Sequence, residues 1–200
     1  MALGKQAKVL TKQQMDLVYS SLSLTQDVHR NRLIFLLSTK AGLRAKEIAD
    51  LRWSMVLDAN GCVIDQISLE DNASKGKSGR VIPLNKQLKV QLVEAFKIVS
   101  IGSSVATLHK ANVIRTQRGN GTTAQVIVNM FQGWYAKAGL FGCSSHSGRR
   151  TFITNAARKI STVGGSLRDV QCLAGHSSLQ TTQRYIDGDS EARRKIVDLV

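Results

Sequence analysis

The sequence has little proline, little cysteine and few acidic residues. Pro83 is the only proline among 200 residues, and the three cysteines are an odd number that does not suit a disulfide framework. Only 14 Asp and Glu stand against 28 Lys and Arg, so the formal net charge is +14 and the isoelectric point is about 10.2. Such a balance is unusual for an enzyme of small acids or sugars, and it indicates a polyanionic partner.

Long apolar runs are also missing. The longest aliphatic or aromatic run is Leu33–Leu37, far short of the roughly 20 residues that a membrane-spanning helix needs. The start of the chain lacks the apolar core of a secretory signal, and neither end carries a lipidation motif. We therefore expect an intracellular, cytoplasmic protein with reduced thiols and no membrane partner.

Helical periodicity runs through most of the chain. Thr11 and Gln14 form a capping box that predicts a helix of about 12 residues. Thr25 is placed to cap a second helix that stops near Gly42, and a short third helix is predicted over 44–51. Further helices are predicted over 87–99, 123–138, 150–159, 167–173 and 190–197.

One region, 54–83, changes to the period of a strand. Its first two segments flank Asn60-Gly61, a dipeptide typical of tight hairpin turns. The polar stretch 72–79 predicts a second loop, which leads into a strand RVIPL. We therefore predict an α+β fold that is mostly α with a small antiparallel sheet, organised as a basic flexible arm over 1–10 and one domain over 11–200.

Several kinds of site can be weighed against the sequence. Cys143 with His146 and Cys172 with His176 offer four zinc ligands, but their order is not that of the common finger. Cys172 also shares a predicted helix face with Val170, which predicts a buried thiol and no metal site. No G-x-S-x-G elbow and no Walker motif occur, which disfavours a serine hydrolase and a nucleoside triphosphate site.

Phosphodiester chemistry without a metal suits the sequence better. It needs arginines to hold the charge of the phosphate oxygens, together with a nucleophile, a base and an acid. Each candidate taken alone is also explained as a solvated charge or a half-buried aromatic, but all occur in one order along a basic chain. The candidates are Arg44, Lys75, His146, Arg149, Arg150, His176 and Tyr185.

That order resembles the tyrosine recombinase, or phage integrase, family, and the similarity extends from about Thr11 to the end. AGLRAKEIADL resembles the first box of the family, with Arg44 as its first catalytic arginine and Glu47 as the acidic residue that supports the site. SKGKSGRVIPL is similar to the hairpin that carries the catalytic lysine, and its VIPL end places Lys75 at that position.

Two further boxes complete the resemblance. HSGRRTF is similar to the H-x-L-R-H-T box and supplies His146 and Arg149, whereas LAGHSSLQTTQRY is similar to the box with His176 and Tyr185. Gly148 replaces the usual leucine of the family, which removes a packing side chain beside the second arginine. Arg150, which follows the second arginine directly, stands where members of the family commonly have a histidine.

The resemblance implies an activity for these residues. Tyr185 attacks a DNA phosphodiester and leaves a 3′-phosphotyrosyl bond and a free 5′-hydroxyl, while Arg44 and Arg149 hold the phosphate oxygens. Lys75 protonates the departing oxygen, and His146 accepts the proton of the phenol.

The other site residues have supporting parts in this scheme. His176 donates a hydrogen bond to a phosphate oxygen, Glu47 orients the cationic groups, and Lys77, Arg80 and Arg150 contact DNA. No metal or cofactor is implied. The implied partners are double-stranded DNA and further copies of the chain, as a tetramer on DNA in the nucleoid, and the N-terminal clamp domain of the family is absent from this sequence.

Two rival functions are kept open. A type IB topoisomerase uses the same chemical groups to nick and reseal one strand, although the hairpin lysine and the glycine-histidine-tyrosine spacing favour a recombinase. An accessory protein that binds DNA and retains the fold is the other rival, although it gains nothing from a phenol beside two arginines. The sequence does not decide between integration, excision, resolution and inversion.

Overall fold

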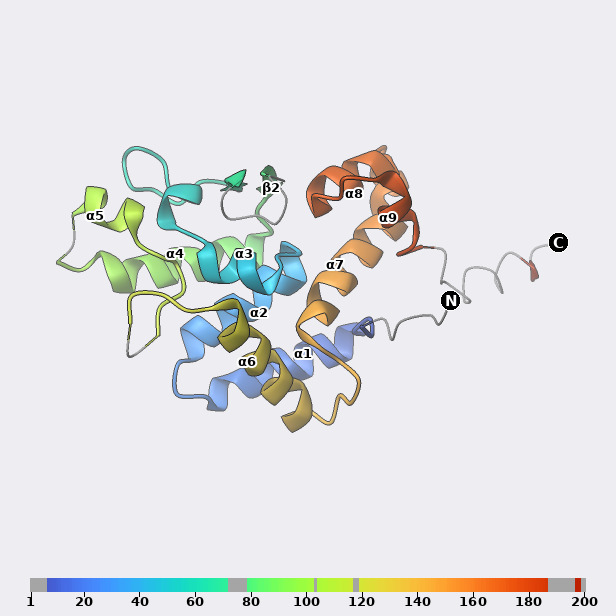
Figure 1. The fold of residues 1–200 in the computed structure, drawn as a ribbon, viewed down its shortest axis with the longest axis horizontal. Coiled ribbons are helices and arrows are strands. Elements are labelled where there is room, and N and C mark those ends of the chain that lie inside the picture. Colours follow the sequence, from blue (N-terminus) through green and yellow to red (C-terminus); the bar gives the residue numbers. More distant parts are fainter. Residues whose placement is uncertain (1–6, 72–78, 103, 117–118, 187–196, 199–200) are drawn as a thin grey trace.

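The protein is described by a computed structural model that covers residues 7–71, 79–102, 104–116, 119–186 and 197–198 (Figure 1). Within these ranges it is a helical protein with one two-stranded antiparallel sheet, as predicted. The helices are α1 (Lys12–Ser21), α2 (Val28–Lys40), α3 (Ala45–Asp50), α4 (Lys86–Ser100), α5 (Val105–Lys110), α6 (Ala124–Lys137), α7 (Ser145–Lys159), α8 (Leu167–Ala174) and α9 (Leu179–Gln183).

The sheet pairs β1 (Gln66–Leu69) with β2 (Arg80–Pro83). Ile67 lies opposite Ile82, and both side chains are buried. The loop predicted over 72–79 falls between these strands in sequence, but residues 72–78 lie outside the described part of the chain, so this loop stays a prediction.

Local signals located some helix starts and misplaced another. The capping box of Thr11 and Gln14 is confirmed at the start of α1. Thr25 does not cap α2: it ends a short 3-10 turn, its hydroxyl donates to the carbonyl of Leu22, and α2 begins after Asp27.

The first predicted strand of the β region is wrong. Residues Trp53–Met55 form a 3-10 helix, because both of these bulky side chains reach the core from one turn. The turn at Asn60-Gly61 is present, with Gly61 at a positive φ of 79°, but it closes only a single bridge between Leu57 and Val63.

Most apolar side chains gather in one cluster, called the main core here. It lies between α2, α3, α4 and α6, and its largest fully buried side chains include Phe35, Trp53, Phe131 and Tyr135. Aromatic rings contact one another within it: Phe131 lies 6.5 Å from Phe35 and 5.9 Å from Tyr135 between ring centroids. This core supports α3 and the sheet.

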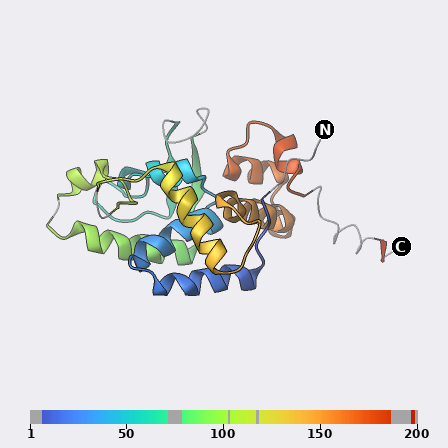
Figure 2. The same ribbon diagram turned by 60° about the horizontal axis from the view of Figure 1, so that its bottom comes forward.

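A second, small cluster lies under α8 and α9. Its buried members are Ile153, Val170 and Ala174, and we call it the terminal cluster. Figures 1 and 2 show α7 extending from the other helices to the pair α8 and α9 at one end of the molecule. Helix α7 therefore connects the two clusters.

Helix α7 approaches α2 closely at Gly148. A Cβ at this position would clash with the hydroxyl of Ser38 and would lie 3.1 Å from Thr39 Cγ2. The glycine therefore does not leave a gap where the family has a leucine. Only a glycine permits α7 and α2 to come this near to each other.

The start of the described chain packs against α7. Leu10 is buried, and its N–H donates to Thr151 Oγ1 at 2.8 Å. Leu10, the last residue of the predicted flexible arm, is therefore held against α7.

Candidate active site

A pocket of about 440 Å³ opens between the N-terminal half of α7 and the segment that follows α9. It brings three predicted site residues, His146, Arg149 and Tyr185, to one cavity. Helix α7 begins at Ser145, earlier than the predicted residue 150, because the Ser144 side chain accepts from the N–H of His146 as an N-cap. The lining residues are Ala7, Ser144, His146, Arg149, Arg150, Thr181, Arg184 and Tyr185.

Arg149 is the buried cation of this pocket. Its side chain donates to the carbonyl of Gly42 and to that of Ala174, both at 2.6 Å, and the residue is only 3% exposed. Burial and the nearby charge of Arg44 lower its pKa to about 10, so the guanidinium stays charged at neutral pH. Two backbone carbonyls from distant segments therefore fix its position.

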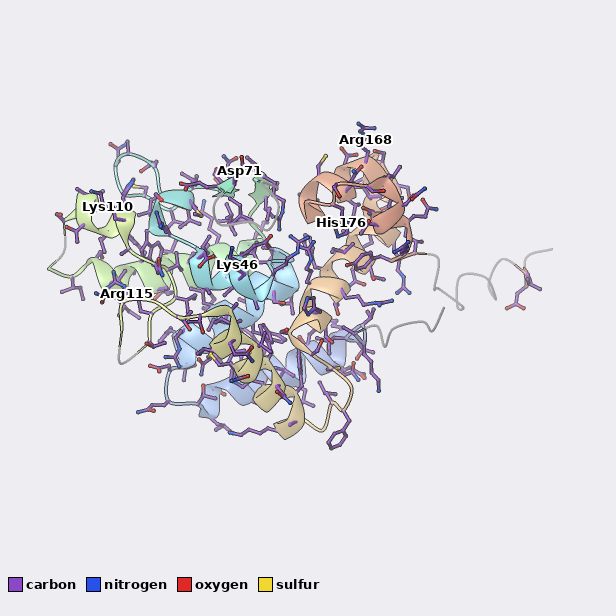
Figure 3. The ribbon with its side chains drawn as sticks, in the orientation of Figure 1. Lys46, Asp71, Lys110, Arg115, Arg168 and His176 are labelled. Carbon is purple, nitrogen blue, oxygen red and sulfur yellow. The ribbon has the colours of Figure 1, made fainter. Side chains whose placement is uncertain are left out.

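His176 lies between Arg149 and α9. Its Nε2 is 3.2 Å from Arg149 Nη2, and its Nδ1 is 2.9 Å from Thr182 Oγ1. Because an arginine can only donate, Nε2 accepts and the ring hydrogen resides on Nδ1. Burial and the positive charge of Arg149 lower the pKa of His176 to about 4, so the ring is neutral at neutral pH. Figure 3 shows His176 at the base of α8.

Thr182 is a site residue that the sequence reasoning missed. Ser178 is the N-cap of α9, and Thr182 is fully buried within that helix. The position of Thr182 between His176 and Tyr185 was the sequence signal that could have identified it as part of the site.

Tyr185 follows directly after α9. Its N–H donates to the carbonyl of Thr182 at 3.0 Å, which completes one further turn. The ring stacks on His176 with centroids 5.4 Å apart and packs against the terminal cluster. Arg150 lies on it as well, with its guanidinium carbon 5.8 Å from the ring centroid, close enough for a cation–π contact.

Glu47 organises a second group of charges. The carboxylate is 1% exposed and accepts from the backbone N–H of Arg44 at 2.8 Å and from its guanidinium at 2.7 Å. Arg80 binds both carboxylate oxygens, each at 3.0 Å. Burial alone would raise the pKa of Glu47, but the hydrogen bonds and charges of Arg80 and Arg44 lower it to about 2.

Arg80 occupies a different place from the one predicted. It was expected to contact DNA from the hairpin, but its side chain is 6% exposed and its guanidinium faces Glu47. Sequence alone gives little indication of the pairing between Arg80 and Glu47, because the two residues are 33 positions apart.

The remaining predicted residues are less constrained. His146 is exposed, and its Nδ1 is 3.5 Å from Ser145 Oγ. Arg150 has a buried Nε without a hydrogen-bond partner. Lys75 and Lys77 lie outside the described residues, as does most of the helix predicted over 190–197.

The zinc alternative has no support in the part of the chain that is described. Cys172 is exposed, so the prediction of a buried thiol is wrong. Among the described residues, no group of three or more His, Cys, Asp and Glu side chains could hold a metal ion. No described helix has the length and apolar character to cross a membrane.

Comparison with known proteins gives the same family for almost the whole chain. A profile described as "Phage integrase family" matches residues 8–192. The chain is 29% identical over 174 residues to the tyrosine recombinase XerC of Myxococcus xanthus and 30% identical over 171 residues to that of Chlamydia muridarum. These matches cover 84% of this chain but 54% and 50% of the relatives, so the chain spans about half of their length.

Solved structures show the same fold. The crystal structure of XerA recombinase matches with a TM-score of 0.74 at 20% identity, over 96% of this chain and 64% of that one. XerH recombinase bound to its palindromic difH substrate in a post-cleavage complex matches with a TM-score of 0.73 at 21% identity, over 98% of this chain and 54% of that one.

Proposed function

Because the chain belongs to the phage integrase family, we propose that it is the catalytic domain of a site-specific tyrosine recombinase that cuts and rejoins DNA. One observation carries the proposal: the ring of Tyr185 stacks on His176, whose Nε2 accepts from the buried Arg149, and Tyr185 and Arg149 line the same pocket. A phenol held beside a fixed guanidinium suits attack on a phosphodiester.

In the proposed reaction, Tyr185 Oη attacks the phosphorus and the bond to the 5′ oxygen breaks. His146 takes the phenol proton, and Lys75 gives a proton to the departing oxygen, so a 3′-phosphotyrosyl bond and a 5′-hydroxyl result. Arg44 and Arg149 balance the charge that grows on the phosphate oxygens. The covalent bond conserves the energy of the diester, so the reverse attack joins a new strand without ATP.

His176 has a positioning part in this scheme. As a neutral ring it accepts from Arg149 and supports the ring of Tyr185. Donation to a phosphate oxygen requires the ring hydrogen on Nε2, and Thr182 permits this shift because a hydroxyl can donate as well as accept.

We propose double-stranded DNA as the partner, in keeping with a net charge of +14. XerH and the Tn1549 integrase are structural neighbours whose structures contain DNA. Exchange of strands between two duplexes requires a nucleophile for each strand, so four copies of the chain assemble on DNA, at the nucleoid. Arg150, which lines the pocket, contacts the DNA backbone there.

The test uses a pool of nicked duplexes with a randomised centre, designed so that the short 5′-hydroxyl fragment released by cleavage dissociates. We expect an SDS-resistant protein–DNA adduct in EDTA with the wild type and with Tyr19→Phe, whose ring faces Arg32 and does not line the pocket. We expect none with Tyr185→Phe. An adduct that survives Tyr185→Phe, or no adduct with any duplex, would refute the proposal.

The products separate the rival functions. Recombinants from paired sites support the recombinase, whereas relaxation of supercoils by single protomers without recombinants supports a type IB topoisomerase. DNA binding without any adduct supports an accessory protein.

A further inference from the structure

Arg80 connects three separate segments of the site. It lies on β2, binds both oxygens of Glu47 on α3, and donates from Nε to the carbonyl of Leu173 on α8 at 2.9 Å. All three donor nitrogens of its guanidinium are therefore engaged by the protein. Such a buried arginine with every nitrogen paired is built to hold other groups in place.

The contact with Glu47 decides how Arg44 is held. Arg80 takes both carboxylate oxygens, so Arg44 binds the same carboxylate through one nitrogen, Nη1, and its side chain stays 27% exposed. Without Arg80, the unneutralised carboxylate would attract the guanidinium of Arg44 inward. It would also place an unbalanced negative charge beside the phosphate.

The contact with α8 fixes the turn before His176. A Cβ on Gly175 would lie 2.8 Å from Arg80 Nη1, so the backbone at this position, at φ 61°, rests directly on the guanidinium. Arg80 and Arg149 take the neighbouring carbonyls of Leu173 and Ala174 at the end of the helix. Cations are favourable there, because the last carbonyls have no partner within the helix.

We propose that Arg80 is a positioning residue of the active site: it balances Glu47 so that Arg44 faces the scissile phosphate, and it fixes the end of α8 that carries His176. The inference rests on the proposed function, because it concerns the arginine assigned to that phosphate. Arg80 itself does not touch DNA.

The test compares two substrates in single-turnover adduct formation, using a duplex recovered from the randomised pool. In the second substrate, a methylphosphonate replaces the scissile phosphate and removes the negative charge that Arg44 balances. On the phosphodiester, we expect Arg80→Met to slow adduct formation by about 100-fold, as a displaced catalytic group does. On the methylphosphonate, we expect Arg44→Met to react at nearly the wild-type rate. We expect Arg80→Met to recover most of its loss there and to keep only the small part that comes from the altered end of α8.

The matched control is Arg30→Met, an arginine that pairs with Asp27 away from the pocket, and we expect wild-type rates on both substrates. Thermal unfolding of each variant sets an assay temperature at which it is folded. Arg80→Lys keeps the charge without the bidentate fork, so it tests the inference if Arg80→Met does not fold, and we expect an intermediate loss that is larger on the phosphodiester.

The outcomes separate two failures. Wild-type protein that forms no adduct with either substrate defeats the proposed function. If the wild type reacts, an Arg80 variant with an unchanged rate on the phosphodiester, or with an equal loss on both substrates, overturns the positioning role.

Discussion

The main core and the terminal cluster support different halves of the same site. The main core includes several buried aromatic rings and holds α3, from which Glu47 binds Arg44 and Arg80. In the described part of the chain the terminal cluster has three buried side chains, and Tyr185 packs against it. Arg44, which is assigned to the phosphate, thus rests on a large core, and the nucleophile Tyr185 rests on a small one.

This difference has a physical consequence. Local opening costs least where few apolar side chains are buried, so the segment with Tyr185 should move more easily than α3. A nucleophile that forms and breaks a covalent bond benefits from such freedom, whereas a charge-balancing group benefits from a fixed place. The contacts of Arg149 and Arg80 with the end of α8 join the two parts.

The largest expected effect is a truncation in the main core. Phe131→Ala removes a fully buried ring in contact with Phe35, Trp134 and Tyr135, and should lower the free energy of unfolding by about 3–5 kcal/mol. Urea unfolding followed by circular dichroism measures it. A loss below that expected for Val170→Ala would contradict the division into a large and a small core.

Val170→Ala in the terminal cluster should cost less stability, about 1–3 kcal/mol, because fewer buried groups are lost. It should nevertheless slow adduct formation more than Phe131→Ala does when both proteins are folded, since Tyr185 packs on this cluster. Val163→Ala, at an exposed site, is the control and should change neither quantity. If Phe131→Ala and Val170→Ala slowed adduct formation equally, the proposed division of support between the two clusters would be wrong.

Gly148→Ala tests the helix contact between the two parts. The added methyl meets Ser38 Oγ and should cost about 1–3 kcal/mol of stability, even though alanine favours helices. Ser38→Ala removes a hydroxyl that has no hydrogen-bond partner, so the double variant should recover part of the loss. A double-mutant cycle with no coupling between the positions would exclude this contact as the cause.

The smallest effect concerns the pH dependence of stability. The pKa of His176 is lowered to about 4 in the folded protein. Below pH about 6.5 the histidine is therefore protonated in the unfolded chain but still neutral in the folded protein. The contribution of this ring to stability is present above that pH and is lost as the pH falls toward 4, with a slope of at most about 1.4 kcal/mol per pH unit. His176→Asn should show a shallower decline of the unfolding free energy between pH 7 and 4. The other three histidines remain in both proteins, so an identical slope would place the ring in solvent.

Features that depend on neighbours in sequence were predictable. The capping box at Thr11 and the spacing of Arg44 and Glu47 are local, and the structure has both. The mostly α fold with a small sheet followed from periodicity, and the family from its four boxes.

Features that depend on tertiary contacts were not predictable. Arg80 was assigned to DNA because nothing near it in sequence reveals that Glu47 lies within hydrogen-bond distance. The strand expected before Asn60 failed for the same reason, since Trp53 enters the core from a 3-10 turn. The burial predicted for Cys172 was an error of periodicity instead: residues two apart on a helix lie about 200° from each other, so the face of α8 that buries Val170 leaves Cys172 exposed.

The most direct test of the account is the location of the covalent bond. Adduct formed on the nicked duplex is digested with nuclease and then trypsin, which cleaves after Arg184 and releases the peptide from Tyr185 to Arg193. The account predicts that this peptide, and no other, gains the mass of a nucleotide 3′-phosphate on its tyrosine. A nucleotide on Tyr19, on a serine or on a cysteine would contradict it.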